Sequence, residues 1–374
     1  MERPVREVMI VAGEASGDLH AAGLAAALRD RQPEWRLTGM GGARMAAAGV
    51  KMLERTDATA VMGFVEVVRT IPHHLSLLKT FRRRLESGAV SCLVTIDYPG
   101  FNLRLAAMAR AAGVPVLYYI VPQVWAWGAD RLPKMASVIT KAAVILPFEE
   151  ELLRAHGIDA RFVGHPLLDR VAGMPSRDAA RSALGVPDEA PVLALFPGSR
   201  QQEIDRHLDD FVRTAALLER GHPGLHVLVA TAPGVVVPSD RCPYRQVTES
   251  SLAVLRAADA AVCKSGTTTL EAAVAGCPLV VAYRTSRWTH AIARRVVRIP
   301  RIGLVNVVAG REVAREFVQS AVVPEAMAEA VSPLLASDSP ERARMERDLA
   351  DVRDRLGAPG AAGRVAEMAE SLAG

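Results

Sequence analysis

Residues 260–273, with the sequence AAVCKSGTTTLEAA, join a short apolar run to a turn of small residues and the start of a helical pattern. This succession predicts a buried strand that leads through a tight turn into a helix. The small residues 265–267 would lie at the start of that helix, where unpaired backbone N–H groups and the helix dipole favour a phosphate. Glu271 would follow within reach of ligand hydroxyl groups such as those of a ribose. The stretch therefore predicts a nucleotide site, with an ordinary capped helix of an α/β domain as the alternative.

Similar apolar runs recur along the chain, separated by helical patterns. They fall at residues 8–12, 92–96, 116–120, 143–146, 192–196, 226–230, 260–263 and 279–282. Runs without polar alternation are typical of parallel strands covered on both faces. Strands that alternate with helices form doubly wound α/β sheets, and the chain has room for two of them. We therefore expect an α/β protein with two Rossmann-like domains.

The expected domain division follows residue 168, because a polar, turn-rich segment at residues 173–188 comes soon after it. We expect an N-terminal domain at residues 1–168 and a C-terminal domain at residues 169–345. Residues 346–374 have helical patterns and are expected to pack back on the N-terminal domain.

The composition, with 50% hydrophobic and 23% charged residues over 374 positions, is that of a folded globular protein. A net charge of +4 gives no reason to expect a nucleic acid as partner. The four cysteines lack the spacing of a metal site, and the N-terminus leads into a strand rather than into an apolar signal segment. No apolar run approaches the length that crosses a bilayer. We therefore expect a cytoplasmic protein without a metal site.

Two carboxylates follow apolar runs in the N-terminal half. Glu14 lies in the GEASGD turn at residues 13–18, and Asp97 begins the DYPGFN turn at residues 97–102. Because doubly wound sheets bind ligands at the carboxyl ends of their strands, both side chains are candidates for catalysis. The alternatives are a plain helix-capping turn at Glu14 and a structural carboxylate at Asp97.

Residues 62–85 combine apolar positions at helical spacing with clustered basic side chains. The pattern fits an interfacial helix on an anionic membrane and equally a surface helix that packs on its own core. Trp125 and Trp127 share the turn after residues 116–120, either as an apolar wall for a ligand or as a plug between loop and core. The residues expected at the acceptor and the membrane are Met62, Phe64, Val67, Lys79, Arg82, Arg83, Trp125 and Trp127.

The C-terminal half adds an arginine to the predicted nucleotide site. In FPGSR at residues 196–200, Arg200 follows a Gly-Ser turn at the end of a strand, where a guanidinium can bind phosphate oxygens. A solvated arginine at a helix N-terminus is the alternative. Asn306 and Gln319 are amides suited to polar ligand contacts. The full set of expected donor-site residues is Ser199, Arg200, Ser265, Gly266, Thr267, Thr268, Glu271, Asn306 and Gln319.

Taken in order, these motifs resemble the lipid-A-disaccharide synthase family of bacterial glycosyltransferases. The motifs are GEASGD at 13–18, MGFVEV at 62–67, DYPGFN at 97–102, YYIVPQVWAW at 118–127, LPFE at 146–149, FVGHPL at 162–167, FPGSR at 196–200, SGTTTLE at 265–271 and LVNVVAGRE at 304–312. Their order and their spread over nearly the whole chain make the resemblance specific. Lys264 and Arg315 depart from it, since many members have a small residue at the first position and often proline at the second.

The resemblance implies a GT-B fold, in which two Rossmann-like domains face each other across a cleft and the C-terminal domain holds the donor nucleotide. It implies transfer of 2,3-diacylglucosamine from its UDP derivative to the 6-hydroxyl of 2,3-diacylglucosamine 1-phosphate, giving a β-1,6 disaccharide and UDP. The expected location is peripheral, on the inner face of the inner membrane. The resemblance also implies that no cofactor or metal is required, and no Asp-x-Asp motif occurs in the chain. A homodimer is left open.

For this reaction, Asp97 is the favoured general base and Glu14 the competing one. Arg200 and the N–H groups of residues 265–267 would stabilise the negative charge of the departing UDP. The rival interpretations are a UDP-sugar epimerase of the same architecture and a lipid-binding protein without catalysis. Release of UDP on mixing with both lipid substrates separates the three.

Overall fold

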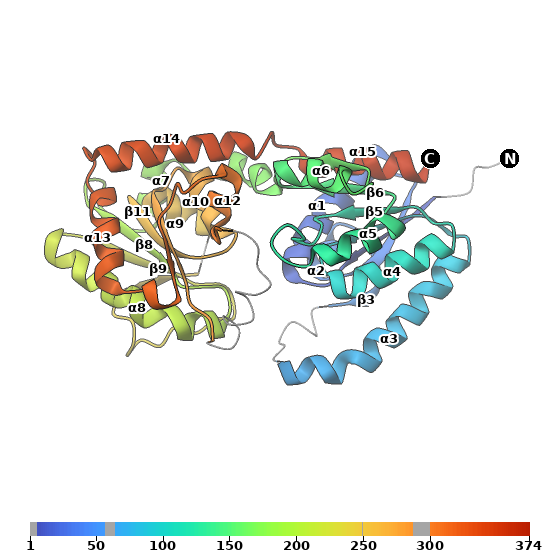
Figure 1. The fold of residues 1–374 in the computed structure, drawn as a ribbon, viewed down its shortest axis with the longest axis horizontal. Coiled ribbons are helices and arrows are strands. Elements are labelled where there is room, and N and C mark those ends of the chain that lie inside the picture. The colour runs from blue at the N-terminus through green and yellow to red at the C-terminus, as the bar shows by residue number, and fades with distance from the viewer. Residues whose placement is uncertain (1–5, 57–63, 249, 287–299) are drawn as a thin grey trace. The chain divides into compact units, whose positions relative to one another are not determined.

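The structure is a computed structural model that describes residues 6–56, 64–248, 250–286 and 300–374, without the side chains of residues 64–72. The chain divides into two compact units (Figure 1). Unit 1 comprises Met1–Asp169 and Ala358–Gly374, and unit 2 comprises Arg170–Gly357. Each unit is built around its own parallel sheet.

The sheet of unit 1 has seven parallel strands in the order β3-β2-β1-β4-β5-β6-β7. The strands are β1 (Glu7–Ala12), β2 (Arg36–Gly41), β3 (Lys51–Arg55), β4 (Val90–Ile96), β5 (Val116–Tyr119), β6 (Lys141–Val144) and β7 (Ala160–Phe162). Strand β1 is buried along its whole length, as expected for a central strand covered on both faces. Strands β2 and β3 are added on one side of β1, and β4 to β7 are added on the other side, so the strand order reverses between β1 and β4. Doubly wound sheets bind ligands at such a switch point.

Helices cover both faces of this sheet, with α1 and α15 on one face and α3, α4 and α5 on the other. The helices of unit 1 are α1 (Ala15–Arg31), α2 (Ala43–Ala47), α3 (Phe64–Glu86), α4 (Pro99–Ala111), α5 (Leu132–Val138), α6 (Pro147–Arg154) and α15 (Ala361–Ala373). The last helix, α15, packs against α1, and Arg31 pairs with Glu370 through Nε and Oε1 at 2.8 Å.

The sheet of unit 2 has six parallel strands in the order β10-β9-β8-β11-β12-β13. They are β8 (Val192–Phe196), β9 (His226–Ala230), β10 (Arg245–Val247), β11 (Ala260–Lys264), β12 (Leu279–Tyr283) and β13 (Glu316–Val318). The switch point of this sheet lies between β8 and β11, where Phe196 is opposite Cys263. Strand β11 and the helix that follows it occupy the stretch from which the nucleotide site is predicted.

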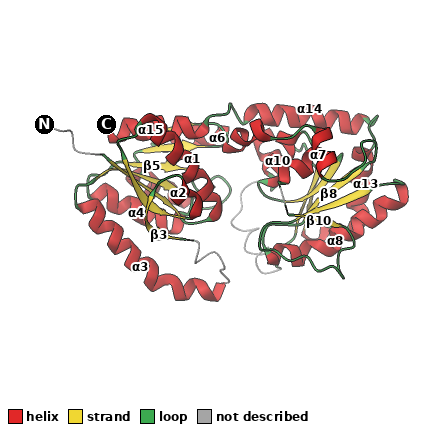
Figure 2. Ribbon diagram, turned by 180° about the vertical axis from the view of Figure 1, so that it is seen from behind, coloured by secondary structure: helices red, strands yellow, loops and turns green. Residues whose placement is uncertain are grey.

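Two layers of helices enclose the second sheet as well (Figure 2). Helices α8 and α13 share one apolar cluster with it, while α9 and α10 lie against strands from the other side. The helices of unit 2 are α7 (Arg177–Ala183), α8 (Gln201–Gly221), α9 (Ser251–Ala257), α10 (Thr268–Ala275), α12 (Leu304–Ala309), α13 (Pro324–Leu335) and α14 (Pro340–Arg355). Helix α14 packs on α10, α12 and α13, so the segment at residues 346–374 is divided between the two units.

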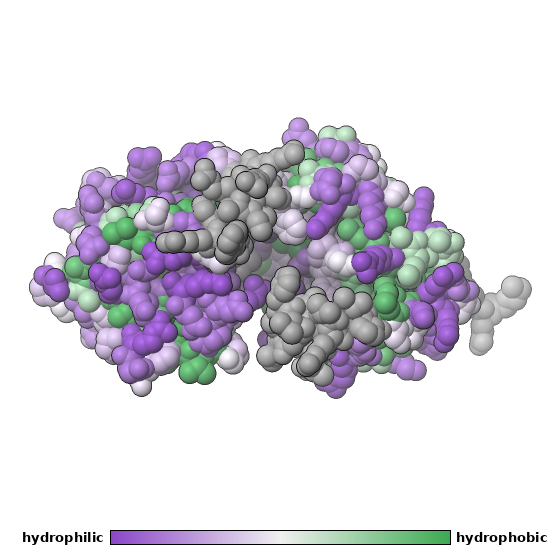
Figure 3. Space-filling model, turned by 60° about the horizontal axis from the view of Figure 1, so that its bottom comes forward, coloured by the Kyte–Doolittle hydropathy of each residue, from purple (hydrophilic) through white to green (hydrophobic). Residues whose placement is uncertain are grey.

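The surface is mostly hydrophilic on the face drawn in Figure 3, and its apolar residues form separate groups. In the part of the chain that the structure describes, the large hydrophobic side chains that stand exposed are Leu19, Leu75, Trp127, Val236 and Val323. None of the described helices is long and apolar enough to cross a membrane.

Candidate active site

Glu14 and Asp97 lie at the switch point of unit 1. Glu14 is the residue before α1, directly beyond β1, and Asp97 follows the last residue of β4. The two strands are neighbours, with Ala12 opposite Ile96, so the sheet brings both turns to one place. Burial and, second, the negative charge of Glu14 raise the pKa of the Asp97 carboxyl above its usual range, although the Tyr98 N–H lowers it. The two carboxylates therefore act on each other electrostatically.

The turn at Asp97 is strained and firmly anchored. Asp97 and Tyr98 have left-handed backbone angles, with φ of 45° and 50°, and such residues cost about 1–3 kcal/mol each. The carbonyl of Asp97 accepts hydrogen bonds from Asn102 Nδ2 at 2.7 Å and from Tyr118 Oη at 2.8 Å. These bonds hold the main chain from which the Asp97 side chain extends.

The ring of Tyr98 rests on the main chain of the GEASGD turn. A Cβ atom at Gly13 would overlap this ring, so only glycine fits there. The hydroxyl of Tyr98 lies 2.8 Å from His74 Nε2 on α3, and Phe101 packs beside both rings. Gly13 and Tyr98 thus join the turns that carry Glu14 and Asp97. Sequence reasoning did not single out either residue, although a glycine at a strand end and an aromatic next to Asp97 were visible signals.

The last residue of the GEASGD motif has a structural role. Asp18 is buried, and its carboxylate accepts hydrogen bonds from the N–H groups of Gly42, Arg44 and Met45 at 2.7, 3.1 and 3.0 Å. These groups are the unpaired donors at the start of α2. Helix capping was the alternative interpretation of this turn. Asp18 does cap a helix, but that helix is α2, and the side chain of Glu14 does not cap α1.

The two tryptophans of the turn after β5 differ. Trp125 Nε1 donates to Glu149 Oε1 at 3.0 Å, and its ring meets Phe148 edge-on at 5.2 Å. Burial raises the pKa of Glu149 to about 7. Trp127 is 42% exposed and carries the guanidinium of Arg131 over its ring at 4.5 Å. Trp125 therefore holds its loop against α6, and Trp127 is the one that a ligand can reach.

Helix α3 uses its apolar face within unit 1. Leu78, Phe81 and Leu85 belong to the buried core of unit 1. These three residues of the apolar face therefore pack on the protein and not on a membrane. Arg84 is paired with the buried carboxylate of Glu7. Of the residues expected at the acceptor and the membrane, Lys79, Arg82 and Arg83 are exposed on α3. Met62 and the side chains of Phe64 and Val67 lie outside the described residues.

The switch point of unit 2 brings the FPGSR and SGTTTLE turns together. Ser199 and Arg200 follow β8, and the side chain of Arg200 is largely exposed. Residues 265–267 connect β11 to α10, which begins at Thr268, so the first N–H groups of α10 point out at this edge of the sheet. Within this turn, Ser265 Oγ donates to Ile302 O at 2.8 Å, while Thr267 stands exposed.

A carboxylate of the protein already occupies the FPGSR turn. Glu203 Oε2 accepts a hydrogen bond from the Ser199 N–H at 2.9 Å, and Glu203 Oε1 lies 2.9 Å from Lys264 Nζ and 3.8 Å from Arg200 Nη1. A Cβ atom at Gly198, where φ is 145°, would overlap Glu203, so glycine permits this approach. Burial raises the pKa of Glu203, but the Lys264 ammonium, the Ser199 N–H and the charge of Arg200 together outweigh burial and hold that pKa below its usual range. Arg200, one of the groups predicted to bind phosphate, therefore faces an internal anion.

The other expected donor-site residues are engaged by the protein. Glu271 Oε1 is 2.9 Å from Arg170 Nη1. The side chain of Gln319, where φ is 55°, pairs with the main chain of Thr285 in the turn after β12. Both stay near the carboxyl edge of the sheet, and both are partly buried.

Asn306 does not fit a direct ligand contact. It is fully buried, and its Oδ1 accepts from the N–H groups of Val313 and Ala314 at 2.7 and 2.9 Å. Its Nδ2 donates to Glu316 Oε1 at 2.8 Å, and the same carboxylate accepts from the Gly303 N–H at 2.8 Å, at the start of α12. Because every polar atom of this amide is bonded within the protein, Asn306 positions the turns around α12 rather than a nucleotide.

Comparison with known proteins decides the family. A family model described as Lipid-A-disaccharide synthetase matches residues 8–362. The chain belongs to this family. A curated relative, the lipid-A-disaccharide synthase of Myxococcus xanthus (strain DK1622), is 42% identical over 383 aligned residues, which cover 100% of this chain and 98% of the relative. The resemblance inferred from the motifs is thereby confirmed, and the chain is a glycosyltransferase with lipid-A-disaccharide synthase function.

Solved structures with low sequence identity share the fold. The glycotransferase of kitacinnamycin superposes with a TM-score of 0.67 at 17% identity, covering 99% of this chain and 100% of its own. A UDP-GlcNAc 2-epimerase from Neisseria meningitidis, bound to UDP-GlcNAc, has a TM-score of 0.64 at 11% identity and covers 98% of each chain. The expected α/β fold of the GT-B type is confirmed. Because the fold serves both a transferase and an epimerase, it does not by itself define the reaction.

Proposed function

We propose that the chain transfers 2,3-diacylglucosamine from UDP-2,3-diacylglucosamine to the 6-hydroxyl of 2,3-diacylglucosamine 1-phosphate, with inversion at the anomeric carbon. Unit 1 binds the acceptor, and unit 2 binds the UDP part of the donor. The products are the β-1,6 disaccharide 1-phosphate and UDP. Membership of the family supports the class of reaction, and the carboxylate pair at the switch point of unit 1 supports the mechanism.

The observation that carries the mechanism is the turn at Asp97. A carboxylate on a strained, anchored main chain, with a pKa raised by burial and by Glu14, is suited to accept a proton near neutral pH. In the proposed step, the 6-hydroxyl proton moves to Asp97 while the oxygen bonds to the anomeric carbon. The bond from that carbon to the phosphate oxygen breaks, and its electron pair leaves with UDP. Glu14 raises the basicity of Asp97 through its charge.

The turns after β8 and β11 supply the positive groups for the leaving diphosphate. Arg200 and Lys264 are the cations there, and the first N–H groups of α10 add the positive end of a helix dipole. Glu203 stands in for a phosphate, because it bonds the Ser199 N–H and pairs with Lys264. These groups support a transfer without a divalent metal, in keeping with the lack of an Asp-x-Asp motif in the sequence.

The exposed basic residues of α3 support contact with an anionic membrane at the inner face of the inner membrane. Lys79, Arg82 and Arg83 are exposed on the helix, and Leu75 is 48% exposed beside them in sequence. Such a surface attracts anionic head groups through its charge, without inserting the apolar face that packs in the core. Trp127 is the proposed apolar contact for the acceptor.

The test is UDP release by the purified chain with both lipid substrates, compared with mixtures that lack one of them. The proposal requires UDP to appear only when donor and acceptor are both present, together with a product of disaccharide mass. An epimerase would convert the sugar of the donor without any acceptor. A lipid-binding protein would bind vesicles and release no UDP.

A further inference from the structure

Unit 2 contains a cavity of about 340 Å³ that lies away from the donor turns. Its lining includes Arg177 of α7, Arg256 of α9 and Arg342 of α14, together with Asp259 and Glu346. We call it the arginine cavity. Asp259 immediately precedes β11, so the cavity lies at the amino end of this strand, whereas the SGTTTLE turn follows its carboxyl end. The two ends of a five-residue strand are roughly 15 Å apart.

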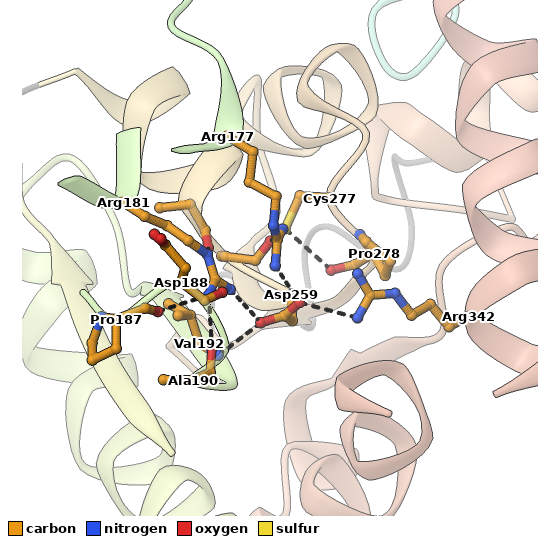
Figure 4. Close-up of polar contacts among 12 residues, drawn as sticks. Arg177, Arg181, Pro187, Asp188, Ala190, Val192, Asp259, Cys277, Pro278 and Arg342 are labelled. Carbon is orange, nitrogen blue, oxygen red and sulfur yellow. Dashed lines mark hydrogen bonds and ion pairs between the residues drawn. The ribbon is translucent and has the colours of Figure 1, made fainter. Parts of the chain in front are cut away.

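Asp259 is the centre of the polar network around the cavity (Figure 4). Its Oδ2 lies 2.8 Å from Arg181 Nη2 and also accepts the Val192 N–H at 2.9 Å. Its Oδ1 lies 2.6 Å from Arg177 Nη2 and 3.1 Å from Arg342 Nη1. One carboxylate thus faces three guanidinium groups that come from α7 and α14.

The charges around the cavity do not balance. Arg181, whose side chain is 2% exposed, neutralises Asp259, and its remaining N–H groups donate to main-chain carbonyls. Arg342 Nε pairs with Glu346 Oε1 at 2.9 Å. Arg177 shares the Asp259 carboxylate with Arg181, and Arg256 has no ion pair with a described residue. Four guanidinium groups, three in the lining and that of Arg181 behind it, therefore face two carboxylates, and the cluster around the cavity carries an excess of two positive charges. Confined charges of one sign are costly unless a counter-ion balances them.

Arg256 also lines the cavity. Its Nη1 donates to Ala275 O at 3.0 Å, which fixes the guanidinium plane. Its Nε is buried, and no described residue accepts a hydrogen bond from it. A buried N–H donor without a partner costs free energy, and such groups usually face a ligand, an ion or an ordered water.

We propose that the arginine cavity binds a multivalent oxyanion of the phosphate class. A dianion matches the excess of two positive charges, and guanidinium groups form paired, charge-assisted hydrogen bonds with phosphate oxygens. The volume holds a phosphate group together with several waters. The bound anion joins α7, α9 and α14, which contribute one arginine each, and so fastens the last helix of unit 2 to the sheet. The site stands independently of the proposed reaction.

The experiment measures the thermal unfolding of the full chain in inorganic phosphate against sodium chloride at the same ionic strength. We expect the unfolding temperature to rise by several degrees once phosphate exceeds its dissociation constant about a hundredfold. In Arg256→Gln the rise should vanish, and titration calorimetry should show phosphate binding weakened about tenfold or more. Arg177→Gln should do the same, and because its side chain is 36% exposed it provides a second variant that tolerates substitution.

Two matched variants locate the effect. Arg344→Gln removes an arginine that is 75% exposed on the same helix α14, and it should keep the phosphate response. Arg200→Gln alters the donor turn and should also keep it, which separates this site from phosphate binding by the UDP site. A second titration with glucosamine 1-phosphate distinguishes the source: equal affinity indicates free phosphate, and tighter binding indicates a sugar-borne phosphate.

Three results would overturn the proposal. The first is a wild-type chain that responds to phosphate no more than to chloride, which would make the cluster an ion-pair network only. The second is a phosphate response that both Arg256→Gln and Arg177→Gln retain. The third is a response that disappears in Arg200→Gln, since phosphate would then be binding at the donor turn.

Discussion

Replacing Asp97 by asparagine removes the proposed proton acceptor while leaving the turn in place. The main-chain carbonyl at this position, not the side chain, carries the bonds to Asn102 and Tyr118. Asparagine also tolerates the left-handed angle of 45° better than most residues. We therefore expect the melting temperature to stay close to the wild-type value, while turnover falls by about 10² to 10⁴, the usual contribution of a general base.

The companion variant Glu14→Gln tests the coupling between the carboxylates. Burial and then the charge of Glu14 raise the pKa of Asp97, so removing that charge should lower this pKa. Because the active form of Asp97 is deprotonated, the wild-type kcat/KM falls as pH drops through the raised pKa. In Glu14→Gln the fall should move to lower pH, by about one unit or less for a partly solvated neighbour.

The assay is UDP release followed from about pH 4 to about pH 8, with UDP affinity and melting temperature measured on the same preparations. UDP affinity should hardly change in either variant, since the nucleotide is assigned to unit 2. The reasoning is refuted if Asp97→Asn keeps most of its activity while Glu14→Gln abolishes it, because Glu14 would then be the base. A large loss of stability in Asp97→Asn would instead reveal a structural carboxylate.

Further predictions concern the donor turn and the membrane. Arg200→Ala should weaken UDP binding and lower turnover together, by about tenfold to a hundredfold for one lost charge-assisted contact, and unchanged kinetics would remove Arg200 from the site. Glu203→Gln should tighten UDP binding by about tenfold in calorimetry, because it frees Lys264 and removes a like charge, and weaker binding would contradict the stand-in role. Reversing the charges of Lys79, Arg82 and Arg83 together should abolish binding to anionic vesicles at moderate salt without changing the melting temperature, and retained binding would show that the membrane contact lies elsewhere. Activity should persist in excess EDTA, and a loss that magnesium restores would contradict the metal-free step.

The central strands could be predicted because burial on both faces leaves an unbroken apolar run. Strands β1, β4 and β8 are buried almost throughout, and the expected runs at residues 8–12, 92–96 and 192–196 fall within them. The edge strands β3, β7 and β10 were missed, since each is short and partly exposed and therefore mixes polar with apolar residues. Strand β2 was also missed, because it contains two glycines and a threonine.

The positions of the candidate site residues followed from the strand ends, but their partners did not. Glu14 and Asp97 were placed correctly at neighbouring strand ends, since the rule for doubly wound sheets needs only the order of the strands. Every polar atom of Asn306 is hydrogen-bonded and Glu203 occupies the FPGSR turn because of the path that the main chain takes through the neighbouring turns. The pattern of residues does not define that path. The apolar spacing of α3 did not indicate whether lipid or the core of unit 1, which contains Phe81, covers the apolar face of the helix. Both environments select the same apolar residues.

The most direct test of the mechanism is the anomeric configuration of the disaccharide that the purified chain forms, read by nuclear magnetic resonance of the isolated product. A single displacement assisted by Asp97 inverts the anomeric carbon of the α-linked donor, so the product must carry a β-1,6 linkage. An α-linked product would require retention through another route, and it would contradict the assignment of Asp97 as the base of a direct attack.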